Sequence, residues 1–470
     1  MTAPGAETRR PAPPKASDAW VAAAVALVAR VATVVWASTR FPPAEDGRFY
    51  DVVARRIAHG LGYTWLWPDG AVTYAAHYPV GYPALVGAGY AIFGEEPAVA
   101  MAINAVLGAV AAFAVHRVAA PSATRAGAML GALAFALHPG LVAYTPALMT
   151  EGATAALVAI AAWLVVRARE SPRIEGPMFV TLVVVLGVAT LVRPQSLLLA
   201  PFYGFLSLRA APFRRRAVVA AAVTAGTILV CSPWTLRNCA RMRACALVSV
   251  NAGWNLFIGA APGATGSWVP IEKLGVPEEC KTVWDEAAKD ACFLRAGERA
   301  IAQAPARWLS LVPPKLADTF DYAGAAGFYL HSSNPRDFDD AAKVALGTLE
   351  TIWQRLVVLA ALVALGRAPG PRRTARRIAA SVSGVWLVVR SAWVAHIGVI
   401  GVAGLLGVRL VDRPAAALAA STVFATALTH AVFFGAGRYS LVCFPALAAL
   451  AGTALTRKEE VGDTDVSKES

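Results

Sequence analysis

The sequence predicts an all-α polytopic membrane protein, from its apolar composition, its long uncharged runs and the placement of its arginines. Of its 470 residues, 57% are hydrophobic and only 16% are charged, whereas soluble domains carry about 25% charged residues. A bilayer core about 30 Å thick requires roughly 20 apolar residues in a helix. The charges are few because they cluster between runs of about that length.

These apolar runs predict about ten to eleven membrane spans. The runs are residues 19–38, 98–119, 126–147, 152–166, 177–192, 196–208, 217–234, 343–366, 378–408, 415–434 and 439–455. The run 378–408 is too long for one comfortable span and contains Arg390 and His396. It is an interfacial helix followed by a span, one tilted span, or a tight pair of spans. Only the pair leaves both Arg438 outside and the C-terminal tail inside.

Arginine clusters in short loops predict the orientation of these spans. The net charge of +13 comes largely from clusters at residues 9–10, 167–173, 209–216 and 367–377. Such clusters are typical of cytoplasmic loops, and no motif of a nucleic-acid-binding fold accompanies them. We therefore expect the bilayer, and no nucleic acid, to be the partner of this charge. We expect a multi-pass protein of the inner (plasma) membrane, with its N-terminus in the cytoplasm.

This orientation divides the chain into a disordered cytoplasmic segment (1–18), a membrane region (19–342), a C-terminal membrane region (343–456) and a disordered tail (457–470). The first apolar run is too long for the core of a signal peptide, so we expect it to be an uncleaved span. The charged tail lacks the apolar residues needed to pack. Two larger outer loops are expected, at residues 39–97 and 235–342.

Four of the six cysteines lie in the second outer loop: Cys239, Cys245, Cys280 and Cys292. A disulfide is permitted on that side of the membrane. The most plausible pair is Cys280 with Cys292, and four free thiols are the alternative. The spacing is not that of a zinc site.

The first outer loop contains a short amphipathic helix with an acid at its start. Apolar and aromatic residues recur every three to four positions between Phe49 and Ile57, which is helical spacing. Asp46 precedes them, and Gly60 is placed to end the helix. Spacing alone favours Asp46 as an ordinary first-turn acid.

Glu151 is the second acid of interest, at the outer end of the run 152–166. An ionisable group near the membrane core is costly and is by default a candidate functional residue. The alternative, an interfacial side chain that reaches water, weighs about equally.

Basic residues at predicted outer ends of spans run against the positive-inside bias. They are Arg193, Arg237, Lys315 and Arg438. An anionic ligand at the outer surface would explain all four, because arginine and lysine are common phosphate partners. Contact with lipid headgroups explains any one of them. Together with the acids they suggest displacement at a sugar carbon, in which a carboxylate deprotonates an acceptor and cations stabilise a departing phosphate.

Other chemistries find little support in the sequence. There is no Walker loop for ATP-driven transport and no Gly-x-Ser-x-Gly nucleophile motif. The histidines are scattered and predict no metal site. His77, in the first outer loop, could line a pocket, although a lone histidine usually does not.

Several motifs recur in an order and spacing that together are specific. After the first run come Asp46, Tyr50, Ala54 and Gly60-Leu-Gly62-Tyr63, followed by Tyr78-Pro79-Val-Gly81-Tyr82-Pro83. Later come Thr150-Glu151, Arg193-Pro194, Pro233-Trp234, Arg237-Asn238, the segment 251–259, Lys315 and Arg438-Tyr439. Through them the chain resembles, over roughly residues 20–455, the GT-C superfamily of polytopic glycosyltransferases, in the bacterial branch related to protein O-mannosyltransferases and the lipid A aminoarabinose transferase.

The resemblance implies a GT-C-like bundle in which residues 19–342 form the catalytic membrane region. It implies transfer of a sugar from a polyprenyl-phosphate-linked donor to a glycan, lipid or protein acceptor on the outer face. Asp46 becomes the general base, with its neighbour Glu45 as the alternative, and Glu151 becomes a second acid shaping the site. Tyr50 and Tyr82 are candidate acceptor or pocket residues, as is His77.

The resemblance also ranks the basic residues as donor-phosphate ligands, with Arg438 and Lys315 ahead of Arg237 and Arg193. Some relatives use a divalent metal and others do not, so a metal is possible and no cofactor is certain. The alternatives are a flippase or other transporter of polyprenol-linked sugars, and a non-catalytic relative. A transporter would need polar residues within the spans, and few charges lie at the span centres.

Overall fold

The protein is a bundle of helices, as the composition predicts, and the described residues add one small two-stranded sheet that it does not predict. The computed structural model describes residues 13–171 and 175–456. Six of its helices are long and apolar enough to cross a membrane. They are α1 (Ala16–Ala37), α4 (Pro97–Ala119), α7 (Thr150–Ala168), α10 (Phe213–Met242), α17 (Asp340–Arg367) and α20 (Pro414–Val432). The count of ten to eleven spans stays a prediction.

Shorter helices complete the bundle, and several correspond to predicted runs that the chain interrupts. They are α5 (Arg125–Ala136), α6 (Pro139–Ala143), α8 (Gly176–Val192), the 3-10 turn η1 (Pro194–Leu198), α9 (Leu199–Leu206), α18 (Arg373–Val389), α19 (Ala392–Gly404), η3 (Gly407–Asp412), η4 (Gly437–Val442) and α21 (Phe444–Gly452). Proline lacks an amide donor and is favoured at the first turn of a helix. Pro139 and Pro445 therefore lie in the first turns of new elements inside runs 126–147 and 439–455, and Pro194 begins η1 just before run 196–208.

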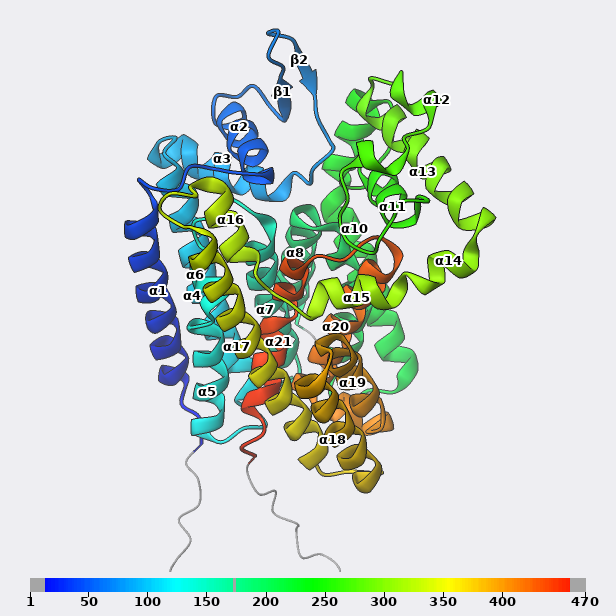
Figure 1. Cartoon of the computed structure of the whole chain (residues 1–470). Helices are drawn as coiled ribbons and strands as arrows, with labels where there is room; N and C mark the ends of the chain where they lie inside the picture. The colour runs from blue at the N-terminus through cyan, green and yellow to red at the C-terminus, as the bar shows by residue number, and fades with distance from the viewer. Residues whose placement is uncertain (1–12, 172–174, 457–470) are drawn as a thin grey trace, which may run out of the picture.

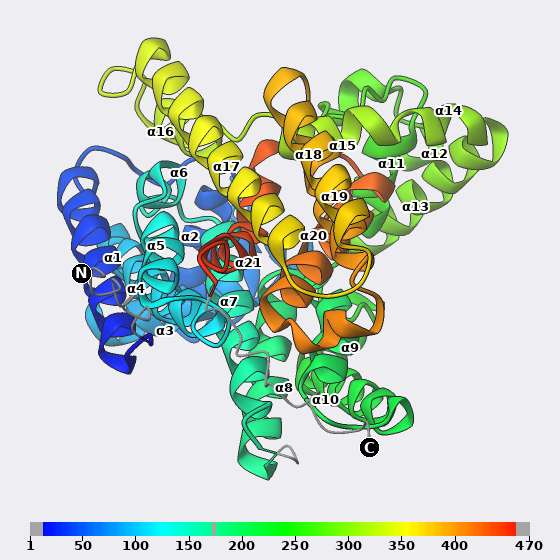
Figure 2. The same ribbon diagram turned by 90° about the horizontal axis from the view of Figure 1, so that it is seen from below.

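Small residues let the helices of the bundle approach closely, as is common between membrane helices. A Cβ on Gly131 of α5 would lie 2.6 Å from the carbonyl oxygen of Ala448 on α21, and one on Gly127 would lie 2.4 Å from that of Gly452. α7 runs through the middle of the bundle and packs on α4, α8 and α21, whereas α1 lies at one side (Figure 1). Figure 2, seen along the bundle, shows α7 and α21 surrounded by the other helices.

The ambiguous run 378–408 is two helices. α18 ends at Val389, and α19 begins at Ala392 and packs back against it. The carboxyl end of α17 and the start of α18 lie at the same end of the bundle as the described chain termini (Figure 1). Two helices fit both the pair of spans and the interfacial helix followed by a span, so these two interpretations stay predictions.

The opposite end of the bundle carries the two predicted outer loops (Figure 1). The first contains α2 (Asp46–Ala58), an antiparallel hairpin of β1 (Thr64–Leu66) and β2 (Val72–Tyr74), and α3 (Gly81–Phe93). The expected amphipathic helix is therefore confirmed in α2, and Gly60 follows it with a φ of +71°.

The second outer region begins inside a helix, because α10 continues past Pro233 to Met242. It then contains α11 (Ala252–Ala260), η2 (Ile271–Leu274), α12 (Glu278–Lys281), α13 (Glu286–Gln303), α14 (Pro305–Ser310), α15 (Val312–Phe320) and α16 (Ala325–Ser333). Two disulfides cross-link it, Cys239–Cys245 and Cys280–Cys292. The second of them joins α12 to α13.

Candidate functional site

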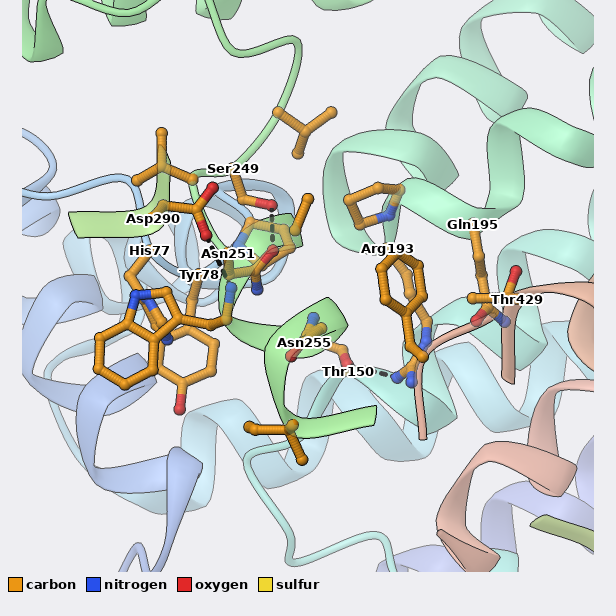
Figure 3. A pocket seen from close by; sticks show the side chains of 18 of the residues that line it. His77, Tyr78, Thr150, Arg193, Gln195, Ser249, Asn251, Asn255, Asp290 and Thr429 are labelled. Carbon is orange, nitrogen blue, oxygen red and sulfur yellow. Dashed lines mark hydrogen bonds between the residues drawn. The ribbon is translucent and has the colours of Figure 1, made fainter. Parts of the chain in front are cut away.

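A large cavity lies where the bundle meets the outer segment. Its volume is about 1080 Å³, at the upper end of the range for small-molecule sites. Its floor comes from the outer ends of bundle elements and its wall from the segment that follows α10. Figure 3 shows His77 and Tyr78 on one side of this space, and Arg193, Gln195 and Thr429 on the other.

Asp46 enters the floor from the first turn of α2. Its Oδ1 accepts a hydrogen bond of 2.9 Å from the Tyr78 hydroxyl, and its Oδ2 accepts one of 3.0 Å from Nη1 of Arg438. Glu45 precedes it with a φ of +50°, a conformation that is strained for a residue with a side chain. The Glu45 carboxylate turns away from the cavity and accepts from the Ser332 hydroxyl on α16. The unusual backbone at Glu45 thus sends two adjacent carboxylates in different directions.

Arg438 connects Asp46 to Glu151. Its Nε lies 3.4 Å from Oε1 of Glu151, whose side chain is only 2% exposed. The same Oε1 accepts from Nη1 of Arg193 at 2.9 Å. Four charges from four separate elements therefore alternate in sign across the cavity floor: Asp46, Arg438, Glu151 and Arg193. Buried charges need such pairing.

Tyrosines surround these charges. Tyr144 donates to Oε2 of Glu151 at 3.3 Å. Tyr50 is buried beneath Asp46, with its ring 5.4 Å from that of Tyr78 and 5.6 Å from that of Tyr82. Burial raises the pKa of both Tyr50 and Tyr78, so both hydroxyls stay protonated and can donate. Tyr82 lies deeper, where its hydroxyl pairs with the Asn104 side chain, and it does not line the cavity.

His77 lies in the cavity wall between two rings. Its ring is 4.8 Å from that of Tyr78 and 5.4 Å from that of Trp254, both edge to face. Burial lowers its pKa to about 4, against the pull of the nearby Asp46 carboxylate. His77 is therefore neutral at physiological pH.

The outer wall carries polar residues that the sequence reasoning missed. Ser249, Asn251, Asn255 and Asp290 line the cavity from the segment that follows α10, and Gln195 and Thr429 line it from the bundle (Figure 3). The Asp290 carboxylate is held by the Trp254 amide at 3.0 Å, and burial raises its pKa. The signal available in the sequence was Asn251 and Asn255, four residues apart. That spacing places two amides on one side of a helical turn.

Two of the four predicted phosphate ligands do not line the cavity. The Lys315 amine is buried and donates to the carbonyls of Ala431 and Val432, at 3.3 and 3.1 Å, where α20 ends. Arg237 donates to the carbonyls of Ala75 and Tyr63, at 2.8 and 2.7 Å, and so fastens the hairpin to α10. Arg193 and Arg438 are the two that the fold brings to the cavity floor.

No group of three His, Cys, Asp or Glu side chains within residues 13–171 and 175–456 is arranged to hold a metal ion. The polar floor instead offers two guanidinium groups, which suit a phosphate, and two carboxylates. A divalent metal remains a prediction from the resemblance.

Comparison with known proteins supports the resemblance seen in the sequence. Residues 77–236, about a third of the chain, match a family described as dolichyl-phosphate-mannose-protein mannosyltransferase. The match includes Tyr78, Glu151 and Arg193 and confirms the resemblance to the GT-C membrane glycosyltransferases. No curated protein matches the sequence closely.

The solved structures that are similar to this chain share little sequence identity with it. One is the oligosaccharyltransferase AglB from Archaeoglobus fulgidus in complex with an inhibitory peptide and a dolichol-phosphate, with 14% identity and a TM-score of 0.45 over 93% of this chain and 49% of that one. Another is ArnT from Cupriavidus metallidurans bound to undecaprenyl phosphate, with 16% identity and a TM-score of 0.39 over 93% and 77%. The present chain thus spans about half the length of AglB.

Proposed function

We propose that this protein is a membrane glycosyltransferase that moves a sugar from a polyprenyl-phosphate-linked donor to an acceptor hydroxyl or amine. The observation that carries the proposal is the floor of the cavity, where Asp46 and Arg438 lie 3.0 Å apart with Arg193 joined to them through Glu151. A carboxylate beside two guanidinium groups provides a proton acceptor and a phosphate site in one space. The mannosyltransferase family match over residues 77–236 supports the same class of donor.

In the proposed reaction, Asp46 takes the proton of the acceptor as the acceptor atom bonds to the anomeric carbon. The bond from that carbon to the donor phosphate breaks, and its electron pair stays on the phosphate oxygen. Arg438 and Arg193 stabilise the resulting charge. A direct displacement of this kind inverts the sugar carbon. Glu151 holds the two arginines in place between turnovers.

The donor phosphate competes with Asp46 for Arg438. While Arg438 is paired with Asp46, its Nη1 occupies Oδ2 of the carboxylate at 3.0 Å. Binding of a phosphate draws Arg438 toward the donor and releases the Asp46 carboxylate for the acceptor. Activation of the base would thereby depend on the donor being bound.

We place the reaction on the outer face of the inner (plasma) membrane. The arginine clusters of the sequence put the opposite end of the bundle in the cytoplasm. The cavity then opens between the outer leaflet and the outer segment. Such a site suits a donor whose polyprenyl chain stays in lipid while its sugar reaches the polar wall.

The proposal is tested with purified protein in detergent, a radiolabelled polyprenyl-phosphate sugar and a membrane lipid extract as acceptor source. The wild type is compared with Asp46→Asn, and with Asp69→Asn in the exposed hairpin turn as the matched control. We expect transfer by the wild type and the control, and a loss of about 10²–10⁴-fold in Asp46→Asn. Undiminished transfer by Asp46→Asn would overturn the assignment of the base. A wild type that neither transfers the label nor binds undecaprenyl phosphate would overturn the function.

A further inference from the structure

A second cavity lies far from the candidate site, between α17 and α18. Its volume is about 710 Å³, and most of its lining is apolar or small, including Leu362, Gly366, Ala380 and Gly384. The glycines keep it open, since a Cβ on Gly384 would lie 3.1 Å from Cδ1 of Leu359. The turn that connects α17 to α18 lies at the end of the bundle where the described chain begins and ends (Figure 1).

This second cavity is an open groove that faces outward from the bundle. Along its rim, Val385, Val388 and Val389 are 62–77% exposed. Side chains so apolar and so exposed, on helices that pack in a membrane bundle, are in contact with lipid chains. The groove is therefore open to the hydrocarbon layer.

Among the described residues that line the groove, two are charged: Arg367, the last residue of α17, and Arg377, in the first turns of α18. Both are exposed, and neither pairs with an acidic group within residues 13–171 and 175–456. Their neighbour Arg376 is different, because it is buried and donates to the carbonyls of Pro371, Ala368 and Leu365 in the connecting turn. As far as the described residues show, Arg367 and Arg377 are thus available to bind an anion from outside the protein.

We propose that this groove binds one anionic phospholipid of the leaflet opposite the candidate site, with Arg367 and Arg377 on its phosphate and its acyl chains between α17 and α18. Basic pockets between membrane helices on the cytoplasmic side are known to accept such headgroups. The bound lipid neutralises two like charges at one helix junction and fills apolar space that the two helices leave open. The site is separate from the proposed sugar transfer and does not depend on it.

The test uses delipidated full-length protein in a neutral detergent, titrated with dioleoyl phosphatidylglycerol and followed by native mass spectrometry and thermal unfolding. One variant is Arg367→Gln/Arg377→Gln. The matched control is Arg373→Gln/Arg409→Gln, which removes two exposed arginines near the same end that do not line the groove. We expect the groove variant to weaken binding of the tightest lipid at least tenfold and to lose the rise in unfolding temperature that lipid produces. We expect the control to behave as the wild type.

Three results would overturn the proposal. Equal weakening in the two double variants would mean diffuse attraction by the whole arginine cluster. An equal rise in unfolding temperature with dioleoyl phosphatidylcholine would mean that the negative charge of the headgroup does not contribute to binding. Equal protection by glycerol phosphate, which has no chains, would mean a soluble-phosphate site. Gly384→Leu, which fills the groove and leaves both arginines in place, is expected to weaken binding as strongly as the loss of charge.

Discussion

Arg438 uses two different nitrogen atoms to bind two different carboxylates, Nη1 to Asp46 at 3.0 Å and Nε to Glu151 at 3.4 Å. These residues are far apart in the chain and come from η4, α2 and α7. The relationship places a single guanidinium between the proposed base and a buried acid. Four predictions follow from this arrangement and from its surroundings.

Replacing Arg438 by lysine should lower sugar transfer even though the positive charge is kept, and removing the charge should lower it further. A lysine is a point charge and cannot reach both carboxylates with a planar fork. For sugar transfer we expect kcat/KM to fall about 10-fold or more in Arg438→Lys and about 10²–10³-fold in Arg438→Gln, the range for removal of one stabilising donor. Steady-state kinetics would measure this. Full activity in Arg438→Lys would mean that the contact of one guanidinium with both Asp46 and Glu151 is unimportant for transfer.

The adjacent acids Glu45 and Asp46 should behave oppositely. Only Asp46 lines the cavity, whereas Glu45 binds Ser332 on α16. We expect Glu45→Gln to keep transfer within about threefold of the wild type and Asp46→Asn to lower it about 10²–10⁴-fold, with equal amounts of folded protein. Size-exclusion profiles provide the folding control. The reverse pattern would identify Glu45 as the base.

Gly259 of α11 should tolerate no larger residue. A Cβ there would lie 1.9 Å from the carbonyl oxygen of Phe433, in the cavity wall. Backbone cannot yield as a side chain can, so α11 must shift. We expect Gly259→Ala to lower stability by about 1–3 kcal/mol and to raise the KM for donor. Gly263→Ala is the control, because its nearest neighbour would lie 3.4 Å away. Thermal unfolding that is identical in the two variants would contradict the prediction.

His77 should make the outer region less stable in mild acid. Its pKa in the folded protein is about 4, below the ordinary 6.5, because burial disfavours its charged form. Between pH 6.5 and 4 the unfolded chain therefore binds a proton that the folded chain does not, and lowering the pH favours unfolding. Between pH 7 and pH 5, we expect the unfolding temperature of the wild type to fall by about 2–4 °C more than that of His77→Gln. If the unfolding temperatures of the two proteins fell in parallel as the pH is lowered, His77 would not be the cause of the acid sensitivity.

The fold class was predictable from the sequence because it depends on local composition. Long apolar runs must form helices in a bilayer, whatever their neighbours are. The start of α2 at Asp46 was equally local, since helical spacing follows it directly. The division of run 378–408 was not decided locally. It depends on α18 and α19 packing against each other and against α17.

The candidate site was likewise only partly predictable from the sequence. Glu151, Arg193 and Arg438 could be singled out as charges that an apolar chain retains at a cost, whereas Asp46 was singled out only through the family resemblance. Lys315 and Arg237 looked identical by that criterion, yet the fold uses one at the end of α20 and the other to hold the hairpin. The polar residues of the wall carry no such cost and gave little signal.

The sequence by itself determined that this chain is a membrane bundle of helices with charged residues near the ends of its apolar runs, because burial of apolar runs and the cost of isolated charge are properties of single residues and short segments. Only the tertiary structure decided which charges meet. The pairing of these charges depends on where the first turns of α2, α7, η1 and η4 lie relative to one another. Those positions are set by close packing between helices distant in the chain.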